Sequence, residues 1–120
     1  MLIVDDEASI RRSLAGILSD EGYRTAEAPN GDAALAEMRG DAMPDAVLLD
    51  IAMPGRDGVA VLEELQRSWP FVPVVMMSGH GTIETAVRAT QLGAFDFLEK
   101  PLSIEKLLLA DRRFKRPIEV

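Results

Sequence analysis

The 120-residue sequence contains no cysteine and only one histidine, His80. Without cysteine, these residues form no disulfide, thiol nucleophile or zinc–thiolate site. A single histidine also builds neither a histidine-based metal site nor a histidine–aspartate relay. Any metal-binding or group-transfer chemistry in this sequence therefore depends on carboxylates, hydroxyls, lysines and arginines.

Long apolar runs and an excess of positive charge are missing as well. The longest nearly uncharged apolar run, Phe71–Met77, is far shorter than the about 20 residues that cross a bilayer. Asp5 and Asp6 stand where a signal peptide needs an apolar stretch after basic residues. The 13 Lys and Arg against 20 Asp and Glu give a formal charge of −7, which disfavours binding to nucleic acid or anionic membrane. We expect a soluble, cytoplasmic protein without membrane contact.

Short apolar runs alternate along the chain with segments of helical periodicity. The runs of strand length are Leu2–Val4, Tyr23–Ala28, Ala46–Leu49, Val72–Met77 and Phe95–Leu98. The apolar helix faces are Ile10/Leu14/Ile17/Leu18, Leu35/Met38, Val59/Leu62/Leu65, Ile83/Val87/Thr90 and Ile104/Leu107/Leu108. We also expect Ser103 to cap the last helix, and Gly22 and Gly93 to end two others in a left-handed conformation.

Five strand–helix units predict one α/β domain. Alternating strands and helices favour a parallel sheet covered on both faces, and five units do not close a barrel. The expected fold is an open, doubly wound, five-stranded parallel sheet of the (βα)5 type. We expect the domain to span residues 1–115, with 116–120 as the start of a linker, because Pro117 would stop a fifth helix.

Polar residues follow four of the five expected strands, and in an open α/β sheet ligands bind beyond the carboxyl ends of the strands. Any one of them is most simply a solvated loop residue or a helix cap, but their joint position at strand ends favours a site. They are Asp5, Asp6 and Glu7 after the first strand, Asp50 after the third, Ser78 after the fourth, and Lys100 and Pro101 after the fifth.

The chemistry of this group is that of phosphoryl transfer. Asp5, Asp6 and Asp50 would repel one another unless a cation lies among them, and hard oxygen ligands without His or Cys suit Mg²⁺. A carboxylate beside a divalent ion can act as the nucleophile on a phosphoryl group. The transferred group then needs positive charge and hydrogen-bond donors at its oxygens, which Lys100 and Ser78 can supply.

Four motifs occur in a specific order and spacing: Ile3–Glu7 (IVDDE), Leu48–Gly58 (LLDIAMPGRDG), Met77–Gly81 (MSGHG) and Phe97–Pro101 (FLEKP). With these motifs the sequence resembles the receiver domains of bacterial response regulators over essentially its whole length. The resemblance implies a flavodoxin-like sheet with strand order 2-1-3-4-5. It also implies a phosphorylation-dependent switch in a two-component pathway, rather than an enzyme with turnover.

The resemblance assigns roles to individual residues. Asp50 would accept a phosphoryl group from a phosphohistidine on a sensor histidine kinase. Mg²⁺ would be held by Asp6, Asp50 and the backbone carbonyl of Ala52, with Asp5 helping through water. Ser78 and Lys100 would contact the phosphoryl oxygens, and Phe97 would be the aromatic switch residue. The peptide bond between Lys100 and Pro101 would be cis.

Ser78–Val87, Gly93–Phe97 and Lys100–Leu102 resemble most the nitrogen-regulation type of receiver. In that type the receiver precedes an AAA+ ATPase that works with sigma-54 and a DNA-binding domain. We therefore expect a piece of a longer transcription regulator, whose contact with nucleic acid would come only through an output domain outside this sequence. The fourth helix, fifth strand and fifth helix would form the output face, at which a homodimer could also form.

The sequence also allows other interpretations. A stand-alone receiver that passes phosphate along or binds a partner would have the same motifs. An aspartyl-phosphate hydrolase of the haloacid-dehalogenase type needs a second Asp two positions after the nucleophile, where this chain has Ala52. A degenerate receiver that signals without phosphorylation is disfavoured by the intact Asp50, Ser78 and Lys100. Gly79-His80-Gly81 is weak evidence for a phosphate loop without a following GK[ST].

Overall fold

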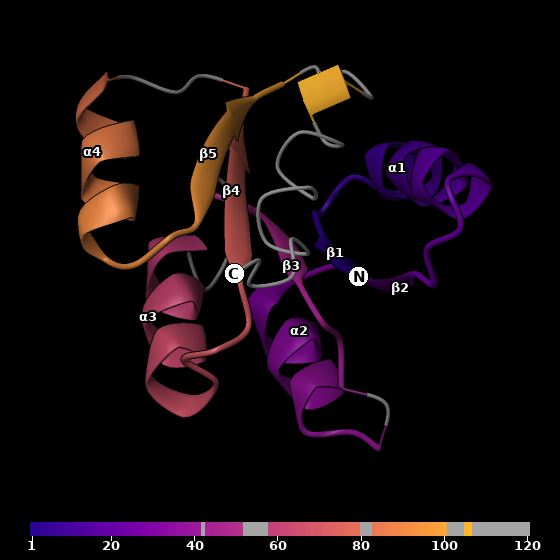
Figure 1. The fold of residues 1–120 in the computed structure, drawn as a ribbon, viewed down its shortest axis with the longest axis horizontal. Helices are drawn as coiled ribbons and strands as arrows, with labels where there is room; N and C mark the ends of the chain where they lie inside the picture. The colour runs from indigo at the N-terminus through magenta and orange to yellow at the C-terminus, as the bar shows by residue number, and fades with distance from the viewer. Residues whose placement is uncertain (42, 52–57, 80–82, 101–104, 107–120) are drawn as a thin grey trace, which may run out of the picture.

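The computed structural model describes residues 1–41, 43–51, 58–79, 83–100 and 105–106. In these ranges five parallel strands form one sheet in the order β2-β1-β3-β4-β5 (Figure 1), which confirms the expected fold and strand order. The strands are β1 (Leu2–Val4), β2 (Ala26–Ala28), β3 (Val47–Asp50), β4 (Val74–Ser78) and β5 (Asp96–Glu99). The helices are α1 (Ala8–Asp20), α2 (Gly31–Met38), α3 (Gly58–Ser68) and α4 (Ile83–Gln91).

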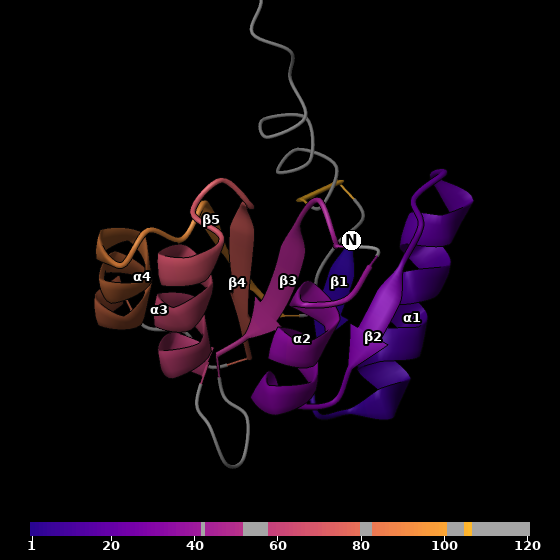
Figure 2. The same ribbon diagram turned by 90° about the horizontal axis from the view of Figure 1, so that it is seen from below.

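Helices cover both faces of the sheet, with α2 and α3 together on one side and α1 on the other (Figure 2). Side chains alternate along each strand, so Leu2 and Val4 pack under α2, α3 and α4, whereas Ile3 packs against α1. The strands β3 and β4 alternate in the same way. Their continuous apolar sequences follow from this, because a strand buried on both faces has no solvent-facing position.

Two expected helix ends and one further cap are present in the structure. Asn30 caps α2, since its side-chain oxygen accepts a hydrogen bond from the backbone N–H of Ala33 at 2.8 Å. Gly22 and Gly93 follow α1 and α4 with φ of 90° and 99°, a conformation that glycine adopts without steric cost. The two glycines direct the chain from α1 into β2 and from α4 into β5.

The expected apolar face of α4 is wrong at two positions. Val87 is 49% exposed and Thr90 is exposed, whereas Ala89 is fully buried and packs into the core. The helix therefore contacts the sheet through a small side chain, and the hydroxyl of Thr90 bonds back to the carbonyl of Ala86 at 2.9 Å. The side chain of Ile83 lies outside the described residues.

Two smaller differences concern element bounds and facing residues. The second strand begins at Ala26 rather than Tyr23, because the N–H of Tyr23 bonds to the carbonyl of Leu18 and closes the end of α1. In α3, Val61 is buried with Leu62 and Leu65, whereas Val59 is only half-buried. Of the fifth expected helix, Glu105 and Lys106 are helical, and Ser103, Ile104, Leu107, Leu108 and the expected linker 116–120 lie outside the described residues.

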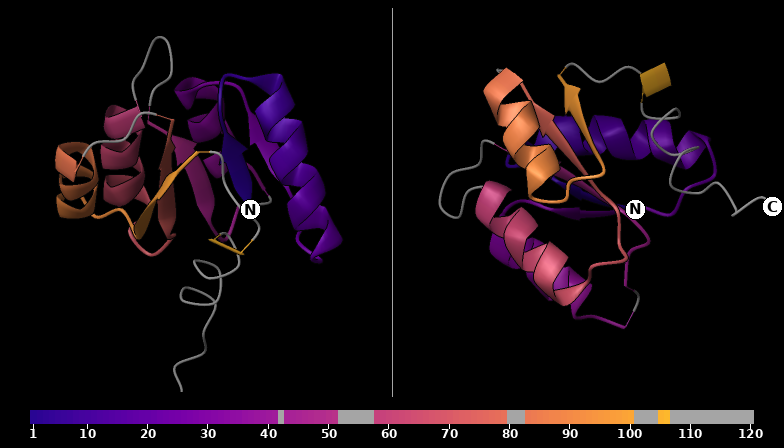
Figure 3. Two further views of the ribbon diagram at one scale, coloured as in Figure 1. Left: turned by 90° about the horizontal axis from the view of Figure 1, so that it is seen from above. Right: turned by 60° about the vertical axis from the view of Figure 1, so that its left-hand side comes forward.

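All five strands run in one direction (Figure 3), so their carboxyl ends lie at one edge of the sheet. The register pairs Asp50 of β3 with Met77 of β4, and Ser78 of β4 with Glu99 of β5. Polar residues that end different strands are thereby brought to the same edge. None of the helices in the described ranges has the length and apolar character needed to span a bilayer.

Candidate functional site: an acidic cluster with a lysine

The strand-end residues lie at this carboxyl edge, and they differ sharply in burial. Asp5 follows β1 and is 0% exposed, and Asp50, the last residue of β3, is 3% exposed. Ser78, the last residue of β4, is 4% exposed. Asp6 is exposed. At this edge two carboxylates and a hydroxyl are thus buried, whereas a third carboxylate is exposed to solvent.

One oxygen from each of Asp5, Asp6 and Asp50 lies within 4.8 Å of the others. Such proximity is unfavourable for like charges unless a cation lies among them. Lys100 supplies one: its Nζ is 2.7 Å from Oδ2 of Asp5 and 3.2 Å from Oδ2 of Asp50. One ammonium against three carboxylates leaves a formal charge of −2, so the cluster is suited to a further cation.

The protonation of Lys100 follows from these contacts. Burial alone would lower the pKa of this lysine, because desolvation disfavours the charged form. The hydrogen bond to Asp5 and the charges of Asp50 and Asp5 outweigh burial and raise the pKa above its ordinary value of 10.5. Lys100 is therefore an ammonium over the whole physiological range.

Both oxygens of Asp5 have a donor. Its Oδ1 accepts the backbone N–H of Glu7 at 2.9 Å, and its Oδ2 accepts Lys100. The backbone N–H of Asp5 bonds to the carbonyl of Ala28 in β2 at 3.2 Å. The carboxylate is thus held by the loop after β1 and by the lysine that follows β5, and the backbone of Asp5 is held by β2.

The backbone behind Asp50 is held by Gly58, a role that sequence reasoning missed. The N–H of Ile51 bonds to the carbonyl of Met77 at 2.9 Å, and the N–H of Gly58 bonds to the carbonyl of Ile51 at 3.1 Å. A Cβ atom at position 58 would lie 2.5 Å from the carbonyl oxygen of Asp50 and from Cα of Ile51. Only glycine allows the backbone at position 58 to come this close to Asp50 and Ile51. The sequence feature that could have indicated this role is a glycine at the start of an apolar helical segment.

Lys100 and Ser78 are joined through the backbone, because the N–H of Lys100 bonds to the carbonyl of Ser78 at 2.8 Å. Phe97 lies two residues before the end of β5 and is half-buried against the core under α2, α3 and α4. It is therefore on the α4 side of the sheet, whereas Leu98 faces the α1 side. Ala52, His80 and Pro101 with its expected cis bond lie outside the described residues.

The donor set of the cluster fits a hard divalent cation. It offers carboxylate oxygens and neither imidazole nor thiolate, which is the chemistry that Mg²⁺ prefers. Burial of Asp5 and Asp50 lowers the local dielectric and strengthens their attraction for a cation. The three carboxylates brought together are those that the sequence analysis named, and they can hold a metal ion.

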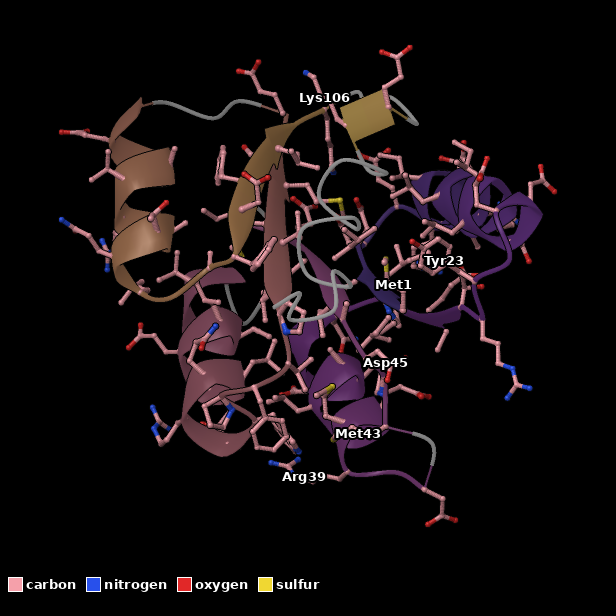
Figure 4. The ribbon with its side chains drawn as sticks, in the orientation of Figure 1. Met1, Tyr23, Arg39, Met43, Asp45 and Lys106 are labelled. Atoms are coloured by element: carbon pink, nitrogen blue, oxygen red, sulfur yellow. The ribbon has the colours of Figure 1, made fainter. Side chains whose placement is uncertain are left out.

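A hollow of about 580 Å³ lies at the opposite edge, where β1, β2 and β3 begin. Met1, Tyr23, Met43 and Asp45 line it (Figure 4). The first three strands separate this hollow from the acidic cluster, since those carboxylates follow the carboxyl ends of the strands. It contributes nothing to the site.

Comparison with known proteins agrees with this geometry. The family model described as response regulator receiver domain matches residues 1–111. The nitrogen assimilation regulatory protein NtrX of Azorhizobium caulinodans is 48% identical over 115 residues, which cover 94% of this chain and 25% of that protein. The transcriptional regulator NtrC of Salmonella typhimurium is 40% identical over 104 residues, covering 87% and 22%.

Among solved structures, the receiver domain of NtrX from Brucella abortus superposes with a TM-score of 0.88 and 49% identity, covering 97% of this chain and 98% of that one. The chain spans about a quarter of the length of the curated relatives it matches. On the family match, the identities and the fold, the chain belongs to the response-regulator receiver family, with NtrX- and NtrC-type regulators among its relatives.

Proposed function

We propose that Asp50 accepts a phosphoryl group from a phosphohistidine of a sensor histidine kinase, with Mg²⁺ bound at the acidic cluster. One observation carries the proposal: the nearly buried Asp50 ends β3 with two further carboxylates within 4.8 Å and a lysine ammonium 3.2 Å away. This combination supplies a nucleophile, oxygen ligands for a metal and positive charge for the transferred group.

In the proposed step a carboxylate oxygen of Asp50 attacks phosphorus, and the bond between phosphorus and the histidine nitrogen of the kinase breaks. Asp5, Asp6 and Asp50 would hold Mg²⁺, which neutralises charge between the nucleophile and the phosphoryl oxygens. Lys100, an ammonium held by Asp5 and Asp50, would move its contact to a phosphoryl oxygen. The Ser78 hydroxyl would donate to another. The product stays on the protein until water hydrolyses it, so the chain acts as a switch rather than an enzyme.

The proposed output follows from the position of Ser78 at the end of β4. Movement of its hydroxyl toward the phosphoryl group would change the space beside β5, where Phe97 packs on the α4 side. The face formed by α4, β5 and the expected fifth helix would then bind its partner or a second copy. The relatives, a nitrogen assimilation regulatory protein and a DNA-binding transcriptional regulator, support a role in the control of transcription. As the family resemblance implies, the chain would control a sigma-54-dependent regulator and would contact DNA only through an output domain.

Intact mass after incubation with Mg²⁺ and acetyl phosphate tests the central step. We expect a gain of one phosphoryl group in the wild type and none in Asp50→Asn, which keeps the side-chain shape and removes the nucleophile. The matched control is Asp45→Asn, an exposed aspartate at the opposite edge, which should be modified like the wild type. A phosphoryl adduct that persists in Asp50→Asn contradicts the assignment.

A further inference from the structure

Arg11, in the first half of α1, reaches back to the loop that carries the acidic residues. Its Nη1 donates to the backbone carbonyl of Asp5 at 2.7 Å, and its Nε donates to Oε1 of Glu27 at 3.3 Å. The side chain is 16% exposed. Since Glu27 lies in β2, one guanidinium connects α1, β2 and the β1–α1 loop.

The carbonyl that Arg11 binds belongs to the peptide group that joins Asp5 to Asp6. The preceding peptide group, which joins Val4 to Asp5, is also fixed, because the N–H of Asp5 bonds to the carbonyl of Ala28. Arg11 therefore fixes the plane of the next peptide, and that plane sets the direction in which the Asp6 side chain leaves the backbone.

Asp6 depends on such backbone control more than its neighbours do. Asp5 is buried and has a donor on each oxygen. Asp6 is exposed, and within the described part of the chain its carboxylate has no hydrogen bond or ion pair. Its place within 4.8 Å of the other two carboxylates is set by the backbone rather than by contacts of its side chain.

The contact needs the shape of arginine. A planar guanidinium presents Nε and Nη1 in fixed relative directions, so it can bind a carboxylate and a carbonyl at once. Glu27 holds the group in that orientation from β2. A lysine keeps the charge, but its single ammonium cannot bridge both acceptors in the same way.

We propose that Arg11 is a positioning residue, which acts through the Asp5–Asp6 peptide and places Asp6 for the cation, with Glu27 orienting the guanidinium. This inference rests on the proposed function, in which Asp6 is a ligand of Mg²⁺. It predicts that loss of Arg11 weakens Mg²⁺ binding. A purely electrostatic role predicts the reverse, because removing a positive charge beside three carboxylates should tighten the binding of a cation.

Calorimetric titration of the 120-residue chain with Mg²⁺ distinguishes the positioning role of Arg11 from a purely electrostatic role. We expect Arg11→Met to raise the Kd about tenfold, the lower end of what loss of a group supporting a metal ligand costs. Arg11→Lys should show most of this loss although it keeps the charge. The matched control is Arg12→Met, which removes the same charge from an exposed neighbour on α1 and should leave the Kd within about twofold of the wild type.

A second readout does not depend on the metal. The amide nitrogen of Asp6 belongs to the peptide that Arg11 binds, so its resonance in the metal-free protein should move in Arg11→Met and stay in Arg12→Met. If Arg11→Met folds poorly, Glu27→Gln, which weakens the hold on the guanidinium, should still raise the Kd and move the same resonance. Unchanged or tighter Mg²⁺ binding in folded Arg11 and Glu27 variants overturns the positioning role. A wild type that binds no Mg²⁺ overturns the proposed function itself, whatever the variants do.

Discussion

Lys100 is the residue whose removal should most disturb the metal-free site. Its ammonium lies between the buried carboxylates of Asp5 and Asp50, at 2.7 and 3.2 Å. Lys100→Met leaves both without their cation, and loss of one partner from a buried ion pair costs about 3 kcal/mol. We expect urea unfolding at pH 8 to show a loss of this size, partly restored by Mg²⁺. Lys106→Met, at an exposed lysine outside the site, is the control and should change the free energy of unfolding little.

The same contact gives stability a dependence on alkaline pH. The folded-state pKa of Lys100 is raised above 10.5, so the folded state binds this proton more tightly than the unfolded state. Its contribution is complete below 10.5 and is lost as pH rises through the higher folded-state value. The free energy of unfolding of the wild type should therefore fall more steeply above pH 10.5 than that of Lys100→Met. Parallel curves for the two proteins would contradict the raised pKa.

At the scale of elements, the junction of β3 and α3 depends on the close approach of Gly58 to Asp50 and Ile51. A Cβ at position 58 would lie 2.5 Å from two backbone atoms, which side-chain rotation cannot relieve. We expect Gly58→Ala to lower the free energy of unfolding by about 3 kcal/mol, at the upper end for overpacking, and to slow phosphorylation of Asp50.

Gly16→Ala is the matched control for that junction. Gly16 lies within α1, and a Cβ at this position would meet no atom within 4 Å, so the same substitution should stabilise the protein by about 0.5–1 kcal/mol. Thermal unfolding of both variants measures the contrast. Equal effects at positions 16 and 58 would contradict the close approach of Gly58 to Asp50 and Ile51.

Most elements and the acidic cluster could be predicted from the sequence, because both follow from local patterns and one topological rule. Continuous apolar runs indicated β3 and β4, and parallel strands place Asp5 and Asp50 at one edge. The face of α4 could not be predicted, because the small Ala89 makes the contact where larger residues were expected. The bond between Arg11 and Glu27 joins residues 16 positions apart on different elements, and no sequence period marks it.

For the whole molecule, the clustered carboxylates link stability to the metal. Three of them lie within 4.8 Å, so their repulsion destabilises the metal-free fold, and a cation bound only to the folded state stabilises it. At ten times Kd the gain is about 1.4 kcal/mol, or roughly 5 °C in Tm for a domain of this size. Thermal unfolding with millimolar Mg²⁺ and with chelator should show this difference.

The variant Asp6→Ala separates carboxylate repulsion in the metal-free protein from stabilisation by bound Mg²⁺. Asp6 is exposed and its side chain holds no described contact, so its removal costs the fold little and relieves repulsion on the buried Asp5 and Asp50. We expect this variant to unfold at a higher Tm than the wild type in chelator and to lose the shift with Mg²⁺. Asp45→Ala, at the opposite edge, should retain the full shift. A wild type that unfolds at the same temperature with Mg²⁺ and with chelator would contradict the proposed metal site, since binding to the folded state alone must raise Tm.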